Sequence, residues 1–243
     1  MWLLLTCAIG GLFATGLSPL AHAIPWSWEK KLGAVIQPEH KAYPGSPQAR
    51  ALLQRLVGRL YPLEPGDKNF SIEVRVVKNP VVNAYAGLGG KITIDSGLLK
   101  QAQSPEELAG VLAHEIEHVR HRHILQKFLE QLFTVESLQW MLGGGWTTNL
   151  AKYFLNIDFT RSQEAQADED GLKRLQKAHI NNRGFRQFFE RMELKNPSSA
   201  FLSDHPSNRA RIEMVERFKN VDVRPIMTPA EWAVLKNYCG GRP

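Results

Sequence analysis

The sequence predicts an α+β domain in which a small β-sheet precedes a set of helices. Between Phe70 and Ile94, short stretches alternate between apolar and other residues, as half-buried strands do. After Asp95, apolar residues recur at helical spacing almost to the end of the chain. The length of 243 residues, with 43% hydrophobic and 22% charged residues, is that of one globular domain with a core. General disorder and fibrous repeats are excluded.

The first 23 residues contain no charged side chain and are mostly apolar from Trp2 to Leu20. Ala21-His22-Ala23 has the small-residue spacing of a signal-peptidase site, so residues 1–23 are predicted to be a cleaved signal peptide. Uncleaved, this run is nearly long enough to anchor the chain in a bilayer. We therefore expect an exported protein, in the periplasm or at the periplasmic face of a membrane. An organellar intermembrane space is the alternative, although the segment lacks the Arg-rich character of a transit peptide.

Residues 24–45, rich in Pro and Trp, are interpreted as an irregular lead-in to a domain that covers residues 46–243. Ser46-Pro47 predicts the start of a helix that extends to about Leu60. The alternation from Phe70 to Val76 predicts a strand. Two further stretches, Val81–Ala86 and Lys91–Ile94, are separated by Gly87-Leu88-Gly89-Gly90 and predict a hairpin.

Charge and cysteine content exclude several classes of protein. Two cysteines are too few for a disulfide scaffold or a Cys₄ zinc site within one chain. The net charge of +6 comes without a basic stripe interleaved with aromatic residues and without a docking motif. A nucleic-acid partner is therefore not expected.

One predicted helix carries a metal-binding pattern. It starts at Ser104-Pro105, which opens a capping box, and contains His114-Glu115-x-x-His118. At 100° per residue the two histidines are about 40° apart, so both imidazoles can reach one tetrahedral ion. Glu115 lies on the adjoining flank, where it can act as a base on water without occupying a coordination position.

The third ligand has to come from another segment. Ser162–Ala178 has a helical pattern in which Glu164, Asp168 and Gly171 share one face. Glu164 would complete a His₂Glu set that leaves the fourth position open. Asp168, one turn later, could accept a hydrogen bond from a ligand histidine. Gly171 would let this helix approach the histidine-bearing helix closely.

With further motifs, these residues resemble the zinc metallopeptidase family that includes HtpX, the CAAX prenyl proteases, the mitochondrial Oma-type proteases and the periplasmic Bep- and Loi-type proteases. The motifs follow the family order over roughly residues 80–215. They are Asn83-Ala84-Tyr85-Ala86 with Gly89-Gly90, His114-Glu115-x-x-His118 with Arg122-His123, Gly143–Gly145, Phe159-Thr160-Arg161-x-x-Glu164-x-x-Ala167-Asp168-x-x-Gly171, and His205-Pro206-x-x-x-x-Arg211-Ile212.

The resemblance implies a mainly helical, zincin-like metalloprotease domain with one zinc ion per chain. It implies that His114, His118 and Glu164 hold the zinc, that Glu115 is the general base and proton shuttle, and that Asp168 supports the ligands. It also implies an edge strand, made of Asn83, Ala84, Tyr85 and Ala86, that borders the cleft and pairs with an extended substrate. His205 would either donate to the oxyanion or act as a fourth ligand. Arg211 would tie down the surrounding region.

Three features are interpreted separately. Glu117 departs from the family pattern, in which a small residue is common at this position, and its helical-wheel angle places it on the polar side, where it could pair with His121. His121 and His123 are expected at the surface or in packing contacts rather than as ligands. Residues 131–157, apolar and aromatic but interrupted by glycines, are interpreted as a mobile cover over the cleft.

The expected function is a zinc metalloendopeptidase that hydrolyses peptide bonds of unfolded or damaged polypeptides, in envelope protein quality control. Contact with a membrane surface is a further expectation. The alternative is a zinc-containing, chaperone-like or latched protein that binds unfolded polypeptide with little turnover. Zinc occupancy cannot separate these two functions, whereas turnover can.

Overall fold

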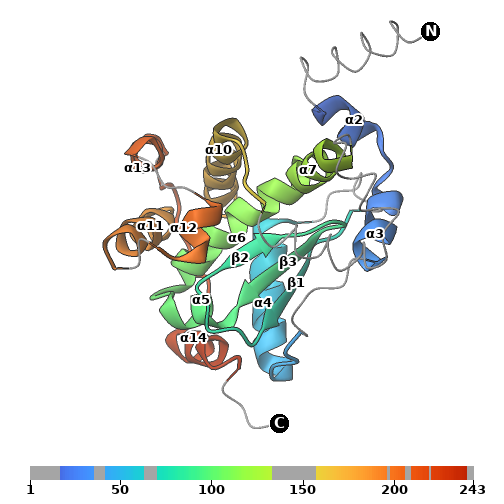
Figure 1. Cartoon of the computed structure of the whole chain (residues 1–243). Coiled ribbons are helices and arrows are strands. Elements are labelled where there is room, and N and C mark those ends of the chain that lie inside the picture. The colour runs from blue at the N-terminus through green and yellow to red at the C-terminus, as the bar shows by residue number, and fades with distance from the viewer. Residues whose placement is uncertain are drawn as a thin grey trace, which may run out of the picture.

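The computed structural model describes residues 17–35, 42–62, 70–132, 157–195, 198–205, 209–218 and 220–239. Within these ranges the chain is mainly helical and contains one three-stranded sheet (Figure 1), which confirms the α+β prediction. The strands are β1 (Glu73–Val77), β2 (Ala84–Ala86) and β3 (Lys91–Asp95). The helices are α2 (Ser18–Ala23), α3 (Trp26–Val35), α4 (Pro47–Leu60), α5 (Ser96–Gln101), α6 (Pro105–Arg120), α7 (His123–Leu132), α10 (Arg161–Lys177), α11 (Arg183–Lys195), α12 (Ala200–Asp204), α13 (Arg209–Arg217) and α14 (Pro229–Lys236).

The sheet has the strand order β1-β3-β2, with β1 parallel and β2 antiparallel to β3. The predicted hairpin is therefore confirmed, and the predicted first strand begins at Glu73 rather than at Phe70. The register places Val76, Ile94 and Ala84 side by side on one face, and all three are fully buried. Helices α4 and α6 contact the sheet and bury this apolar face.

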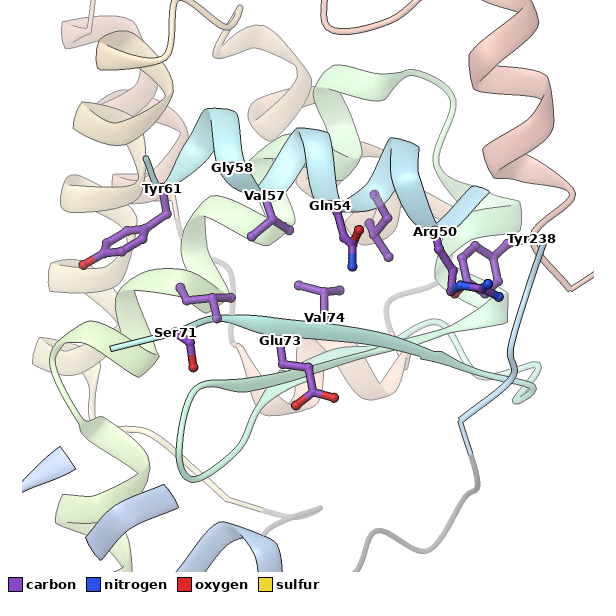
Figure 2. A pocket seen from close by; sticks show the side chains of 11 residues that line it. Arg50, Gln54, Val57, Gly58, Tyr61, Ser71, Glu73, Val74 and Tyr238 are labelled. Atoms are coloured by element: carbon purple, nitrogen blue, oxygen red, sulfur yellow. The ribbon is translucent and has the colours of Figure 1, made fainter. Parts of the chain in front are cut away.

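The two edges of the sheet have different neighbours. At the β2 edge, Asn83 and Gly87 form the backbone hydrogen bonds to β3. Backbone groups alternate in direction along an antiparallel strand, so those of Ala84 and Ala86 point away from β3, toward the outer edge. At the β1 edge, α4 and β1 enclose a groove of about 340 Å³ (Figure 2). This groove lies across the sheet from β2.

Helix α3 corrects the prediction of an irregular lead-in. Pro25 precedes its first residue, a place where the missing N–H of proline costs little, and the following residues are helical. The Glu29 carboxylate accepts a hydrogen bond of 3.0 Å from the backbone N–H of Gly89, and Lys91 Nζ donates to the Gly33 carbonyl at 2.7 Å. The helix therefore supports the β2–β3 turn, in which Gly89 adopts a positive φ of 72°.

The predicted signal-peptidase site lies partly within the folded domain. Ala21 is fully buried in α2, and Arg122 donates hydrogen bonds to the carbonyl oxygens of Ala21 and Ile24. Residues 1–16 of the predicted signal peptide lie outside the described residues. Within the described ranges, no helix has the length and apolar character needed to cross a membrane.

Helix α6 occupies the centre of the molecule, between the sheet and helices α10 and α11 (Figure 1). Its start is as predicted: Ser104 caps the helix by accepting a hydrogen bond from the Glu107 N–H. A Cβ atom on Gly171 of α10 would lie only 3.3 Å from the backbone nitrogen of His114, so the two helices pack closely as expected. Of the predicted cover, residues 133–156 lie outside the described residues.

Candidate metal centre

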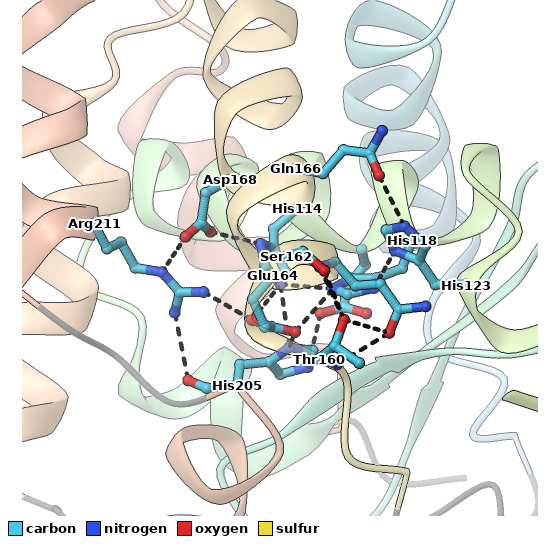
Figure 3. A network of polar contacts seen from close by, with 12 residues as sticks. His114, His118, His123, Thr160, Ser162, Glu164, Gln166, Asp168, His205 and Arg211 are labelled. Carbon is cyan, nitrogen blue, oxygen red and sulfur yellow. Dashed lines mark hydrogen bonds and ion pairs between the residues drawn. The ribbon is translucent and has the colours of Figure 1, made fainter. Parts of the chain in front are cut away.

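Four side chains from three segments converge at the inner face of α6 (Figure 3). His114 and His118 come from α6, Glu164 from the first turn of α10, and His205 directly follows α12. All four are buried, and their ligand atoms lie within 4.8 Å of one another. The Nε2 atoms of His114 and His118 are 2.9 Å apart. Glu164 oxygens lie 3.5 Å from His114 Nε2 and 3.3 Å from His118 Nε2.

This donor set fits a tetrahedral cation. Ligand atoms 2.0–2.1 Å from a tetrahedral zinc ion lie about 3.3–3.4 Å from one another, close to the spacings in this cluster. A cation shared between the two Nε2 atoms would use the lone pairs of both neutral imidazoles. Two imidazoles and one carboxylate are also the ligand types of catalytic zinc sites.

His205 lies at the fourth corner of the cluster. Its Nδ1 atom is 3.1 Å from His114 Nε2 and 3.0 Å from Glu164 Oε1, and its Nε2 atom is 3.3 Å from Glu115 Oε1. Burial opposes the charged form of this histidine, but the carboxylates of Glu164 and Glu115 outweigh it and raise the pKa of His205 to about 9. The geometry is compatible with both roles expected for His205.

Glu115 lies beside the cluster without belonging to it. The side chain is fully buried, and neither carboxylate oxygen has a hydrogen-bond partner among the described residues. Burial raises the pKa of Glu115, while His205, His114 and the backbone N–H of Ala86 favour its charged form. A buried carboxylate with free lone pairs next to a donor cluster is suited to accept a proton from a bound molecule.

The His114 side of the cluster is held by charged groups. His114 Nδ1 lies 2.9 Å from Asp168 Oδ1. Arg211 donates to the other oxygen of Asp168 and also to Glu164 Oε2, the latter at 2.8 Å. The guanidinium group lies over the ring of Phe189, 4.2 Å from its centroid. The structure thus places Asp168 and Arg211 directly behind two of the candidate ligands.

The His118 side is held by neutral groups that sequence reasoning missed. His118 Nδ1 lies 3.0 Å from His123 Nδ1, and His123 Nε2 lies 3.2 Å from Gln166 Oε1. His123 is only 1% exposed, and burial lowers its pKa to about 4. The ring of Phe159 stacks on that of His118 with centroids 4.0 Å apart. The available signal was the Arg122-His123 pair that follows the His114–His118 pattern in the sequence; in the structure Arg122 has a positive φ of 54°, and His123 returns to His118.

The expectation that Glu117 lies on the polar side of α6 is wrong, because this residue is fully buried. Helix α10 covers that flank and brings Arg174, which donates to Glu117 Oε1, while Arg120 donates to Oε2 at 2.9 Å. His121 is 3.6 Å from Glu117 but closer to Asp170, at 2.8 Å. Arg120 and Arg174 thus pair with Glu117, and Lys173 pairs with Asp170, so we assign no metal to this second group of side chains.

The four residues predicted to bind substrate divide into two pairs. The backbone carbonyl of Asn83 accepts a hydrogen bond from the Asp95 N–H of β3, and its side-chain amide donates to Asp204 Oδ2 at 2.8 Å. Asn83 therefore joins α12 to the strand. Tyr85 is paired with Thr93 of β3, and by strand alternation its backbone groups face β3 as well. Only Ala84 and Ala86 turn their backbone groups to the outer edge, beside Glu115. No described strand pairs with this edge.

Comparison with known proteins agrees with this site. Three curated relatives are the mitochondrial metalloendopeptidase OMA1 of Schizosaccharomyces pombe (28% identical; 63% of this chain and 48% of the relative), a putative beta-barrel assembly-enhancing protease of Vibrio cholerae (32%; 48% and 27%) and the mitochondrial metalloendopeptidase OMA1 of Homo sapiens (28%; 63% and 33%). The matches thus span less than half the length of these relatives. The model of "Peptidase family M48" matches residues 47–219, which include all four clustered side chains and Glu115. The chain therefore belongs to peptidase family M48.

Proposed function

We propose that this protein is a zinc-dependent metalloendopeptidase that hydrolyses peptide bonds of unfolded or damaged polypeptides. The observation that carries the proposal is the buried carboxylate of Glu115 beside four convergent ligand atoms, with Oε1 3.3 Å from His205 Nε2. Membership of a peptidase family and the similarity to metalloendopeptidases support the same activity.

His114, His118 and Glu164 would hold one zinc ion per chain, with His205 at the fourth position. When bound, zinc supplies a Lewis acid that lowers the pKa of water and polarises the peptide carbonyl. Asp168 contacts Nδ1 of His114, and His123 contacts Nδ1 of His118. The Nε2 atoms of both candidate ligands would therefore face the ion.

Glu115 would move the proton. Burial raises its pKa above the usual value of a glutamate, and the carboxylate would take a proton from the attacking water and later release it. The acceptor of that proton is the nitrogen of the leaving amine. Because α6 carries both Glu115 and the ligand histidines, the base and the metal are held in one rigid frame.

The outer edge of β2 would orient the substrate. The backbone groups of Ala84 and the carbonyl of Ala86 can pair with an extended polypeptide, which adds as a further strand, while the Ala86 N–H faces Glu115. This pairing holds the backbone of the substrate next to Glu115. Only a segment free of its own secondary structure can pair in this way, which supports unfolded polypeptide as the substrate class.

A second candidate function is favoured by the contacts of His205. Its ring reaches both Glu164 and Glu115, at 3.0 and 3.3 Å, and so lies where a substrate carbonyl would approach. A protein held in this state would be latched, and it would bind unfolded polypeptide with little turnover. In the active enzyme the displaced histidine would instead donate a hydrogen bond to the oxyanion.

We place the protein in the cell envelope, exported to the periplasm or to the periplasmic face of a membrane, with a role in protein quality control. The relatives named as beta-barrel assembly-enhancing proteases support this location, and the mitochondrial relatives support an organellar location as the alternative. The hydrogen bonds from Arg122 to Ala21 and Ile24 favour retention of the N-terminal segment as an anchor over cleavage after Ala23.

The test is hydrolysis of unfolded casein by the zinc-loaded full chain, with the products identified by mass spectrometry. We expect internal cleavage that a chelator abolishes and added zinc restores. Glu169→Gln, which neutralises an exposed carboxylate of α10, serves as a control and should cut like the wild type. Zinc-bound protein that leaves casein intact would instead favour the latched function.

A further inference from the structure

A line of hydrogen bonds runs from the candidate ligand His118 to the protein surface (Figure 3). It passes from His118 Nδ1 to His123 Nδ1, at 3.0 Å, and from His123 Nε2 to Gln166 Oε1, at 3.2 Å. His123 is buried, whereas Gln166 is exposed on α10. The catalytic steps described above use neither His123 nor Gln166 directly.

The contacts allow one arrangement of protons when a metal is bound. A histidine that offers Nε2 to a metal keeps its proton on Nδ1, so His118 must donate to His123. A neutral His123 that accepts at Nδ1 carries its own proton on Nε2 and donates it to Gln166. The Gln166 carbonyl oxygen is an acceptor, so all three groups are satisfied.

The position of His123 is fixed from several directions. It is the first residue of α7, directly after Arg122, whose backbone has a positive φ and whose side chain is bound to α2. Its ring stacks on that of His121 with centroids 5.4 Å apart and lies 6.1 Å from that of Phe159. The ring is therefore not free to turn away from His118.

We propose that His123 is a positioning residue that fixes the tautomer and ring orientation of His118, with Gln166 as the terminal acceptor, and so tunes the zinc affinity of the site. The proposal rests on the proposed zinc site. The Nδ1 atom of His114 faces the carboxylate of Asp168, whereas that of His118 faces an uncharged relay. The donor strength of His118 therefore depends on the group at position 166.

The experiment measures the zinc dissociation constant of the full chain by competition with a chromophoric chelator. We expect His123→Ala to weaken zinc binding by about 10–100-fold, the usual effect of losing a group that orients a metal ligand. His22→Ala is the matched control, because His22 is exposed on α2 and bonds to Ser18 rather than to a ligand or to His123, and it should leave the affinity nearly unchanged. Circular dichroism checks that each variant is folded.

The exposed end of the relay allows a test that does not depend on a core substitution. Gln166→Leu should weaken zinc binding by less than His123→Ala, since water can replace the lost amide. Gln166→Glu should strengthen zinc binding, because a carboxylate acceptor makes His123, and through it His118, more basic. In a His123→Ala background the gain from Gln166→Glu should disappear, as a double-mutant cycle would show.

The tautomers supply an independent readout. Nitrogen NMR of the zinc-loaded protein should show His118 protonated at Nδ1, and His123 protonated at Nε2 with an unprotonated Nδ1. Two results would overturn the proposal: equal effects of His123→Ala and His22→Ala on zinc affinity, or a gain from Gln166→Glu that persists without His123. Wild-type protein that binds zinc with the expected variant pattern but cuts no substrate would refute the proposed function alone. Wild-type protein that binds no zinc would overturn both.

Discussion

The two candidate ligand histidines of α6 are supported in different ways. His114 faces the carboxylate of Asp168, which is itself held by the buried guanidinium of Arg211. His118 faces a neutral imidazole whose outer partner is an exposed amide. A buried charge is costly to leave unpaired, whereas a neutral hydrogen bond contributes modestly. We infer that the His114 side makes the site rigid, whereas the His118 side adjusts the affinity of the site for zinc.

The largest effect is expected from substitution of Asp168, on the charged His114 side of the centre. Asp168→Ala leaves Arg211 without one of its two buried carboxylate partners and His114 without an acceptor. We expect a loss of about 3–5 kcal/mol in the free energy of unfolding, together with a fall in zinc affinity larger than that of His123→Ala. Urea denaturation and chelator competition measure the two quantities.

Asp168→Asn is the matched variant, because it keeps an acceptor for His114 but removes the charge that faces Arg211. Its free energy of unfolding should lie between those of the wild type and Asp168→Ala. Equal zinc affinities for Asp168→Ala and His123→Ala would contradict the expected difference between the His114 and His118 sides.

Zinc removal should have the next largest effect. A metal that binds only the folded state stabilises it by about 2.7 kcal/mol at a free zinc concentration of 100 times the dissociation constant. We expect a chelator to lower the melting temperature of the wild type and to leave that of Glu164→Ala nearly unchanged. Equal shifts for both proteins would show that stabilising zinc binds elsewhere.

Substitution of His205 tests the role of this residue on the side of the centre that a substrate would approach. Because His114, His118 and Glu164 remain, His205→Ala should change zinc affinity much less than loss of one of these ligands. Hydrolysis of casein should fall by roughly 10²–10³-fold if the oxyanion loses its donor. A rise in turnover would instead favour the latched state.

The smallest effect is expected far from the metal, at Glu29. Burial raises the pKa of this carboxyl above 4.5, despite the Gly89 N–H and Arg122. The folded state therefore holds this proton more tightly than the unfolded state, so the contribution of Glu29 to stability falls as pH rises from the unfolded pKa through the folded pKa. Glu29→Gln should remove this part of the pH dependence, as urea denaturation at a series of pH values would show. An unchanged pH profile would contradict the assignment.

Features encoded within a few residues could be predicted from the sequence. Ser46 and Ser104 cap their helices as the local motifs indicate, and the glycines between β2 and β3 form the expected hairpin turn. The i, i+4 spacing likewise brings His114 and His118 together, because helix geometry alone sets that distance.

Features that depend on partners far along the chain could not be predicted from local patterns. Glu117 is buried because Arg174, 57 residues later, neutralises it, and the helical-wheel angle of α6 contains no information about α10. The role of His123 depends on Gln166 in the same way. Helix α3 was missed because the prolines on either side of it, together with Trp26 and Trp28, masked a helical segment that packs on the β2–β3 turn.

The most direct test of the central claim compares Glu115→Gln with the wild type at equal zinc occupancy. The substitution keeps the shape of a buried side chain and removes only its ability to accept and release a proton. We predict that kcat for casein falls by at least about 10²-fold, with the zinc dissociation constant little changed. Equal turnover by the two zinc-loaded proteins would contradict the account, since Glu115 could then not be the base.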